Sequence, residues 1–336
     1  MAASVPANAQ AFDDEEAVVY SKVSFWTRLR RHKLALAGVV VLAAIMLCAL
    51  LAPLLAPFDP NAIDNVHWQG EVLPPCFVGS MLCGGHLLGT DAIGRDEISR
   101  LLFGARVSLE VGIFTVIFEV MIGVVVGAIS GYFGGWVDWL LMRLTDVFLS
   151  IPLLPLLLVL TAIAFESKTN IEVQIFSLTL KLSNAAALSF WVIVLIIGLL
   201  SWPTVARLVR ASFLVLRERE FTEAARAIGA GNLRIMFRHL LPNAVAPIIV
   251  QATLDVANII VLESTLSFLG YGIQPPTASW GNMLTDAQAN FQARGPHGEL
   301  IGIWAAIFPA LCILLTVLSI NFIGDGLRDA LDPNMK

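Results

Sequence analysis

Seven ionisable residues lie within or beside long apolar stretches, where an unpaired charge is expensive. They are Glu110, Glu119, Asp138, Arg143, Asp146, Asp255 and Glu263. Two common catalytic patterns are missing. A phosphate-binding loop needs a Gly-Lys pair and the zinc-protease motif needs His followed by Glu, and neither dipeptide occurs. We therefore assign no catalytic, metal-binding or cofactor-binding residue, and look for function in single charges and loop motifs.

The composition indicates an integral membrane protein. Of 336 residues, 57% are hydrophobic and 14% are charged, against roughly 25% charged in soluble domains; the mean hydropathy is +0.79. A soluble core could not bury so much apolar surface. The same figures exclude a disordered chain, a collagen and a coiled coil.

Six stretches are long enough to cross a membrane, since each crossing takes about 20 apolar residues. They cover residues 34–57, 107–130, 137–165, 188–206, 243–268 and 300–323. We expect an all-α polytopic fold of six transmembrane helices. Gly123, Gly127 and Gly131 recur every fourth residue and predict close helix–helix packing. Pro152 and Pro155 predict a bend in the third span.

Basic residues predict the orientation, because cytoplasmic loops carry the excess of Lys and Arg. With the N-terminus in the cytoplasm, 15 of the 21 basic residues fall on that side and 6 on the other. Both termini are then cytoplasmic. Cys76 and Cys83 face an oxidising side, where a disulfide can form, and the sequence leaves their pairing open.

These spans predict the organisation of the chain. It comprises a cytoplasmic N-terminal segment (1–33), a first transmembrane helix (34–57), an external loop with an amphipathic helix (58–106), a five-helix core (107–323) with a cytoplasmic loop at 207–243, and a cytoplasmic tail (324–336). The first 20 residues and residues 166–186 have no assigned role.

The membrane charges receive two interpretations. Asp255, Asn258 and Glu263 fall within a broad arc of the fifth span and could line a translocation path, because charges inside a membrane mark pathways or pairs. Arg143 and Asp146 lie three residues apart on one helical face, where we expect a structural ion pair.

The long cytoplasmic loop is predicted to be a helix–turn–helix outside the bilayer. Good helix formers occupy residues 218–228, Gly229 and Gly231 permit a positive φ at the helix end, and a second helix over 233–241 stops against Pro242. The apolar side chains of this loop either pack on the bundle or form a projecting surface for a soluble partner.

The external loop carries a compact group of charges. They are Asp91, Arg95, Asp96 and Arg100. Asp96 is placed to cap an amphipathic helix that ends near Arg106. One interpretation is a local charge network that fixes the loop.

Four motifs resemble those of one family. Glu223-Ala224-Ala225, three residues, Gly229, nine residues and His239-Leu240-Leu241-Pro242 resemble the EAA motif of bacterial ABC importer permeases, with His239 at a usually apolar position. Three further stretches resemble the C-type permease subunit of dipeptide and oligopeptide importers. They are HLLGTDAIGRD from His86, QPP from Gln274 with WGNML from Trp280, and NFIGDGLRDALDP from Asn321. The motifs keep the family's order over roughly residues 25–335.

The resemblance implies a type I ABC importer permease in the bacterial plasma (inner) membrane, with no enzymatic activity of its own. A homologous second permease would complete the pore. One or two types of ABC ATPase would bind ATP and Mg²⁺, so no cofactor is expected in this chain, and an external binding protein would deliver peptide. Membrane lipid is expected around the subunit, and no nucleic acid.

The resemblance also implies roles for named residues. The ATPase-coupling residues would be Glu223, Ala224, Ala225, Gly229, His239, Leu241 and Pro242. The second interpretation of Asp91, Arg95, Asp96 and Arg100 is contact with the binding protein.

Two other function classes compete with this one. A proton-coupled secondary transporter acting alone would use Glu119, Asp255 or Glu263. Such transporters commonly have internal inverted repeats, and none is recognisable here. A membrane scaffold or receptor without transport is the third. Because the family also carries nickel chelates, glutathione, antibiotics and sugars, peptide is the family-level expectation.

Overall fold

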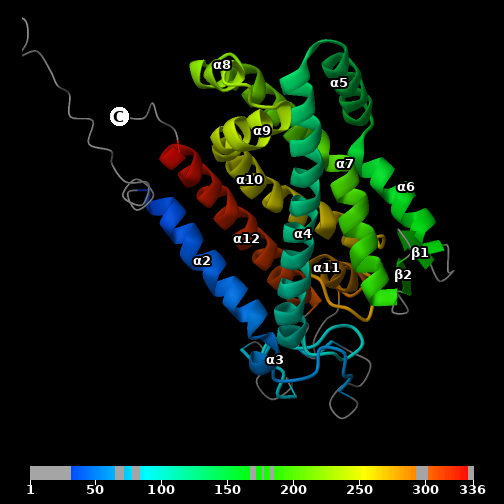
Figure 1. Ribbon diagram of the computed structural model, residues 1–336. Helices are drawn as coiled ribbons and strands as arrows, with labels where there is room; N and C mark the ends of the chain where they lie inside the picture. Colours follow the sequence, from blue (N-terminus) through cyan, green and yellow to red (C-terminus); the bar gives the residue numbers. More distant parts are fainter. Residues whose placement is uncertain are drawn as a thin grey trace, which may run out of the picture.

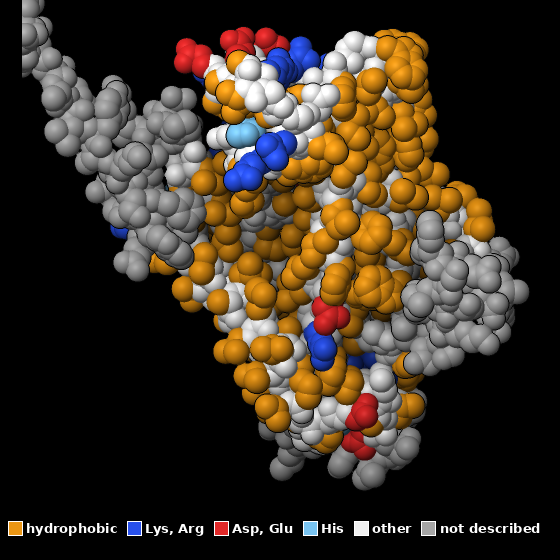
Figure 2. All heavy atoms as spheres, in the orientation of Figure 1, with side chains coloured by type: hydrophobic (Ala, Val, Ile, Leu, Met, Phe, Trp, Pro, Cys, Tyr) orange, Lys and Arg blue, Asp and Glu red, His pale blue; other side chains and the backbone are white. Residues whose placement is uncertain are grey.

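The computed structural model describes residues 32–64, 72–77, 84–166, 172–175, 178–181, 185–292 and 302–331. Within these ranges, five helices are long and apolar enough to cross a membrane (Figure 1). They are α2 (Lys33–Leu50), α4 (Glu97–Phe133), α7 (Ala185–Leu216), α10 (Leu241–Phe268) and α12 (Gly302–Leu331). Hydrophobic side chains dominate the visible face between the two ends of the bundle (Figure 2). The predicted helical membrane fold is confirmed.

The third predicted span is broken. α5 (Gly135–Ser150) and α6 (Leu153–Glu166) meet at an angle of 82°, and together they would make a sixth span. Pro152 accounts for the break, because a proline disfavours helical backbone at the preceding residue. Ile151 is indeed extended, with φ −86° and ψ 129°.

Helix α4 is longer than predicted. The expected boundary between an amphipathic helix ending near Arg106 and a span from residue 107 is wrong, because one unbroken helix of 37 residues begins at Glu97. Asp96 caps it as predicted, accepting a hydrogen bond from the Ser99 amide at 2.8 Å. At 1.5 Å per residue the helix is about 55 Å long, so it extends beyond a hydrocarbon core of about 30 Å.

Short elements occupy both ends of the bundle (Figure 1). One end carries α8 (Glu220–Ala227), α9 (Asn232–Arg234) and the π-helix η1 (Ile235–Leu240); the other carries α3 (Ala52–Leu55) and α11 (Trp280–Ala289). A hairpin of β1 (Glu172–Ile175) and β2 (Leu178–Lys181), which the all-α prediction omits, pairs antiparallel.

The start of α2 and the end of α12 lie side by side, in the half of the bundle that carries α8 (Figure 1). His32 at the start of α2 and Asp329 near the end of α12 form an ion pair of 3.7 Å. The start of α2 and the end of α12 therefore lie on the same side of the bundle, and the cytoplasmic identity of that side stays a prediction.

Helices α4 and α7 pack closely through three glycines of α4. An added Cβ would lie 2.6 Å from the Cβ of Val205 at Gly123, and 2.6 Å from the Cβ of Phe213 at Gly131. At Gly127 it would collide with a backbone carbonyl oxygen of α7. The glycine repeat thus brings two backbones together, as its spacing predicted.

Gly127→Ala is expected to destabilise the protein by about 1–3 kcal/mol, because the rigid backbone of α7 must move to admit the methyl group. The measurement is the thermal unfolding midpoint in detergent. Gly231→Ala is the matched control, since its Cβ would meet nothing within 4 Å. Equal midpoints for the two variants would contradict the packing argument.

Candidate functional site

The EAA loop, residues 217–242, folds as a helix, a tight turn and a second helical segment. Gly229 follows α8 with a φ of +80°, the left-handed conformation that glycine adopts without steric cost. The positive φ predicted for Gly231 is wrong, since this residue precedes α9 with φ −69° and ψ 154°. One left-handed residue is sufficient for the turn.

The second helical segment does not stop at Pro242, contrary to the prediction. η1 continues into α10 at Leu241, and Pro242 lies in the first turn of α10. The π-helix shifts the hydrogen-bond register there, which accommodates a proline that has no amide hydrogen to donate. The Asn243 side chain donates to the His239 carbonyl at 2.6 Å. The EAA loop is therefore continuous with a long apolar helix.

The apolar side chains of the EAA loop divide between two faces. Ala225, Ile235, Met236 and Leu240 are buried in one core with Phe213 of α7. The exposed set is Phe221, Ala224, Ile228, Leu233 and Phe237, with Ile228 exposed to 86%. One face of the loop therefore packs on the bundle and the other projects from it, so each of the two alternatives considered from the sequence holds for one face.

The motif residues follow the same division. Glu223, Ala224, Gly229 and Pro242 are exposed, His239 and Leu241 are half-buried, and Ala225 is buried.

Acidic and basic side chains gather over the α8 end of the molecule (Figure 2). Tyr132 of α4 donates to Asn232 at 2.9 Å, and the Arg226 guanidinium lies 5.8 Å from the Tyr132 ring centroid. These contacts tie the loop to α4.

Charges near this end join α5 to α7. Arg210 donates from Nε and Nη2 to the Asp138 carboxylate at 2.5 and 2.6 Å. Asp146 pairs with Arg207 at 2.5 Å, whereas Arg143 lies over an indole ring of its own helix. The ion pair predicted within α5 between Arg143 and Asp146 is thus replaced by a bridge between helices, because α7 brings Arg207 to Asp146.

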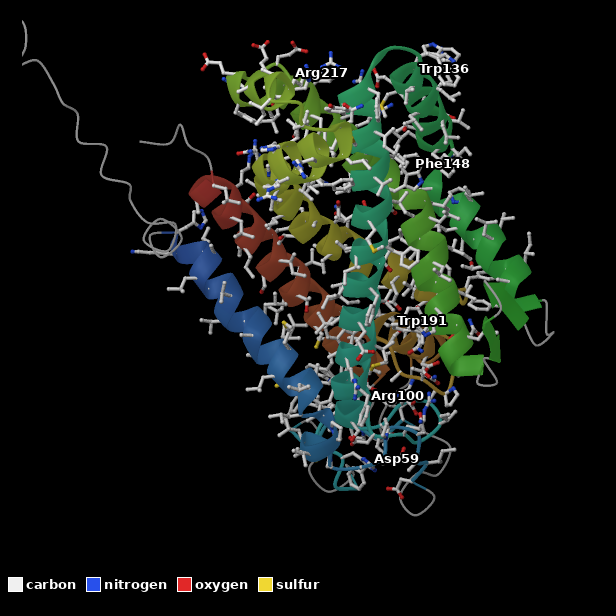
Figure 3. All side chains as sticks on the ribbon, viewed as in Figure 1. Asp59, Arg100, Trp136, Phe148, Trp191 and Arg217 are labelled. Atoms are coloured by element: carbon white, nitrogen blue, oxygen red, sulfur yellow. The ribbon has the colours of Figure 1, made fainter. Side chains whose placement is uncertain are left out.

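Two of the three predicted pathway residues line what we call the membrane cleft, of about 480 Å³. Its polar lining comprises Glu119, Ser201, Thr204, Asp255 and Asn258. The α5–α6 break and Phe148 form an apolar wall. Phe148, labelled in Figure 3, packs on Trp202 of α7 with ring centroids 5.4 Å apart. The cleft therefore lies where the broken pair meets α4, α7 and α10.

Glu263, the third predicted pathway residue, lies elsewhere. It is fully buried and accepts hydrogen bonds from Ser267 at 2.7 Å, Ser108 at 3.3 Å and Ser264 at 3.4 Å. The Trp280 amide donates to the Ser108 hydroxyl at 3.3 Å. Glu263 therefore joins α4, α10 and α11, and it is absent from the described lining of the membrane cleft.

The charges at the opposite end form a buried network. It includes Asp286 of α11, which was not among the predicted charges. Arg95 donates to Asp91 at 2.6 Å and to Asp286 at 2.9 Å, and Arg100 donates to Asp286 at 3.3 Å. Burial raises the pKa of Asp286, and the guanidinium groups of Arg100 and Arg95 oppose that rise. Arg100 is labelled in Figure 3 near the start of α4. The predicted local charge network is present.

His86 lies between two carboxylates at this end of the molecule. Its Nδ1 lies 2.8 Å from Asp96 and its Nε2 lies 3.1 Å from Asp64. The candidate charges Asp91, Arg95, Asp96 and Arg100 are all buried. A delivery protein would therefore first meet exposed side chains such as Leu87 and Ile93, and its contact with this loop stays a prediction.

Cys76 is disulfide-bonded, whereas Cys48 and Cys312 are free. The partner considered from the sequence, Cys83, lies outside the described residues. A disulfide is typical of an oxidising, extracytoplasmic environment, which agrees with the predicted sidedness of this loop.

Asp286→Asn is expected to lower the free energy of unfolding by about 1–3 kcal/mol, because two buried guanidinium groups lose a charged acceptor. The thermal midpoint in detergent and the rate of tryptic cleavage after Arg95 measure the loss. Glu110→Gln, which removes an exposed partner of Arg106, should change the stability by less than about 1 kcal/mol. A similar response of both variants would show that the network does not hold this end together.

Two family models match the chain. One describes the binding-protein-dependent transport system inner membrane component and matches residues 123–336. The other describes the N-terminal transmembrane domain of oligopeptide transport permease C and matches residues 23–75.

Transport permease proteins are similar to this chain over nearly its whole length. A dipeptide transport system permease protein of Alkalihalophilus pseudofirmus is 37% identical over 321 residues, covering 94% of this chain and 92% of the relative. A glutathione transport system permease protein of Escherichia coli O6:K15:H31 is 37% identical over 315 residues, covering 93% of this chain and 90% of the relative. The described residues form five to six helices that are long and apolar enough to cross a membrane. Together with the family, they make this a multi-pass protein of the bacterial inner membrane. The chain belongs to the binding-protein-dependent transport system inner membrane components, in the C-type branch of peptide ABC importer permeases.

Proposed function

We propose that this chain forms half of the membrane pathway of an ATP-driven peptide importer and that the EAA loop couples it to ATPase subunits. The observation that carries the proposal is the two-faced α8. One face is buried with α7 and η1, and the other exposes apolar side chains beside acidic ones. An exposed apolar surface of this kind is typical of a docking site.

Movement of α8 would reach the membrane cleft through packed contacts. The Thr222 hydroxyl donates to the Leu216 carbonyl at 2.9 Å, which anchors the start of α8 to the end of α7. Beyond the turn, η1 continues into α10, which supplies Asp255 and Asn258 to the cleft. Closure of docked ATPases would therefore shift α7 and α10, and both helices line the cleft.

The other components are proposed from the family. A homologous second permease would complete the pore, and an external binding protein would deliver the substrate. One or two types of ATPase subunit would bind ATP and Mg²⁺, which fits the lack of a Gly-Lys pair in this chain. The α8 end and both termini would face the cytoplasm.

The membrane cleft also fits a second candidate, a proton-coupled transporter acting alone, since Glu119 and Asp255 supply carboxyl groups to it. For the ATP-driven importer, we expect peptide uptake into cells to persist after an uncoupler abolishes the proton gradient, for as long as ATP lasts. Uptake that collapses together with the gradient at constant ATP would favour the second candidate.

Gly229→Val tests the coupling role. A β-branched residue is strained at a φ of +80°, so we expect loss of peptide-stimulated ATP hydrolysis with membrane insertion intact. The measurement is ATPase activity of the transporter purified through a tag on this chain, with mass spectrometry to identify the proteins that copurify.

Gly231→Val is the matched control, because Gly231 has a φ of −69° and open space around it. Full stimulation is expected in this control. Full stimulation in the Gly229 variant as well would contradict the coupling role of the EAA loop. Purification of the chain without any ATPase would contradict the proposal that it is part of an ATP-driven importer.

A further inference from the structure

The membrane cleft contains one buried carboxyl oxygen atom, Oε2 of Glu119, that accepts no hydrogen bond from an amide or hydroxyl donor of the described residues. Glu119 itself is only 2% exposed. A buried carboxyl oxygen without a donor is costly. Because Glu119 lines the cleft, a molecule entering the cleft could supply that donor.

A second carboxyl group lies beside the first. Asp255 of α10 interacts with Glu119 of α4 through a carboxyl–carboxyl hydrogen bond and charge repulsion, and both line the same cleft. Asp255 accepts from the Gln251 side chain at 2.9 and 3.1 Å. None of the described residues that line the cleft is basic. The cleft is therefore rich in acceptors, and its own lining supplies no compensating cation.

The rest of the lining limits the kind of group that fits. Ser201, Thr204 and Asn258 add polar atoms, while Phe148, Leu149, Leu153, Leu200, Ile259 and Leu262 are apolar. A primary ammonium group has three donors and one compact charge. Two carboxyl groups with neighbouring hydroxyl groups can satisfy it, and the apolar wall can accommodate the attached aliphatic part.

We propose that the membrane cleft binds the primary ammonium group of the substrate in transit, with Glu119 and Asp255 as its acceptors. The ammonium group would be the amino terminus of a peptide or a lysine side chain. This inference rests on the proposed function and adds a selectivity element within the permease itself.

A neighbouring cleft supports the position of this site. It has a volume of about 500 Å³ and is lined by Gln251, which hydrogen-bonds Asp255 in the membrane cleft. Gln251 is nearer than Asp255 to the start of α10, so the second cleft lies closer to the EAA-loop end. Arg328 also lines it. A guanidinium group repels an ammonium group, which restricts the proposed site to the membrane cleft.

Carboxyl labelling in the purified transporter, with its copurifying partners, tests the site without requiring transport. Dicyclohexylcarbodiimide modifies carboxyl groups in apolar surroundings, and mass spectrometry identifies the modified residues. Ala-Ala is expected to slow modification of Glu119 and Asp255, whereas N-acetyl-Ala-Ala is not. Equal protection by both dipeptides, protection by neither, or equal protection by sodium chloride alone would overturn the proposal.

Uptake by variants provides the second measurement. Glu119→Gln and Asp255→Asn should each lower the uptake ratio of Ala-Ala to N-acetyl-Ala-Ala by roughly tenfold relative to wild type, as expected for loss of one charged hydrogen bond. The comparison with wild type cancels any preference of the binding protein. Glu110→Gln, on the same helix but exposed and paired with Arg106, should keep the wild-type ratio.

The two proposals fail in different ways. Wild-type transporter that takes up neither dipeptide would refute peptide import, and the labelling result would still decide the ammonium site. Wild-type uptake with an unchanged ratio in both cleft variants would refute the ammonium site and leave peptide import intact.

Discussion

The close contact between α4 and α7 is the interaction on which the other parts of the molecule depend. Three glycines of α4 allow two backbones to meet, in a membrane fold where packing between helices cannot rely on the hydrophobic effect. The same α4 supplies Tyr132 to the EAA loop, Glu119 to the membrane cleft and Arg100 to the network at the opposite end. All three regions therefore share one helix of 37 residues.

Features that depend on a short stretch of chain could be predicted from the sequence. The glycine spacing predicted the helix contact, Asp96 predicted the cap of α4, and Gly229 predicted the left-handed turn of the EAA loop. Long apolar stretches predicted the membrane-crossing helices, and Pro152 predicted the break in the third. In each case the determining physics lies within a few residues.

Features that depend on which helices become neighbours could not be predicted in this way. Asp146 has a basic residue three positions away, but the tertiary contact brings it to Arg207. Asp255 and Glu263 lie on one helix eight residues apart, a rotation of about 80°, yet one lines a cleft and the other is enclosed by serines. Asp286 had no local signal, because its partners come from a distant part of the chain.

The long distance in sequence between Arg95 and Asp286 delays their contact while the protein is being synthesised. The hydrogen bond between Arg95 and Asp286 joins residues 191 positions apart. At 5–20 residues per second, the ribosome reaches Asp286 about 10–40 s after Arg95. During that interval the guanidinium groups at the start of α4 lack this acceptor. The network can therefore close only late in synthesis, so its formation marks a chain that has inserted nearly all of its helices, and truncated chains would present an open end to quality-control proteases.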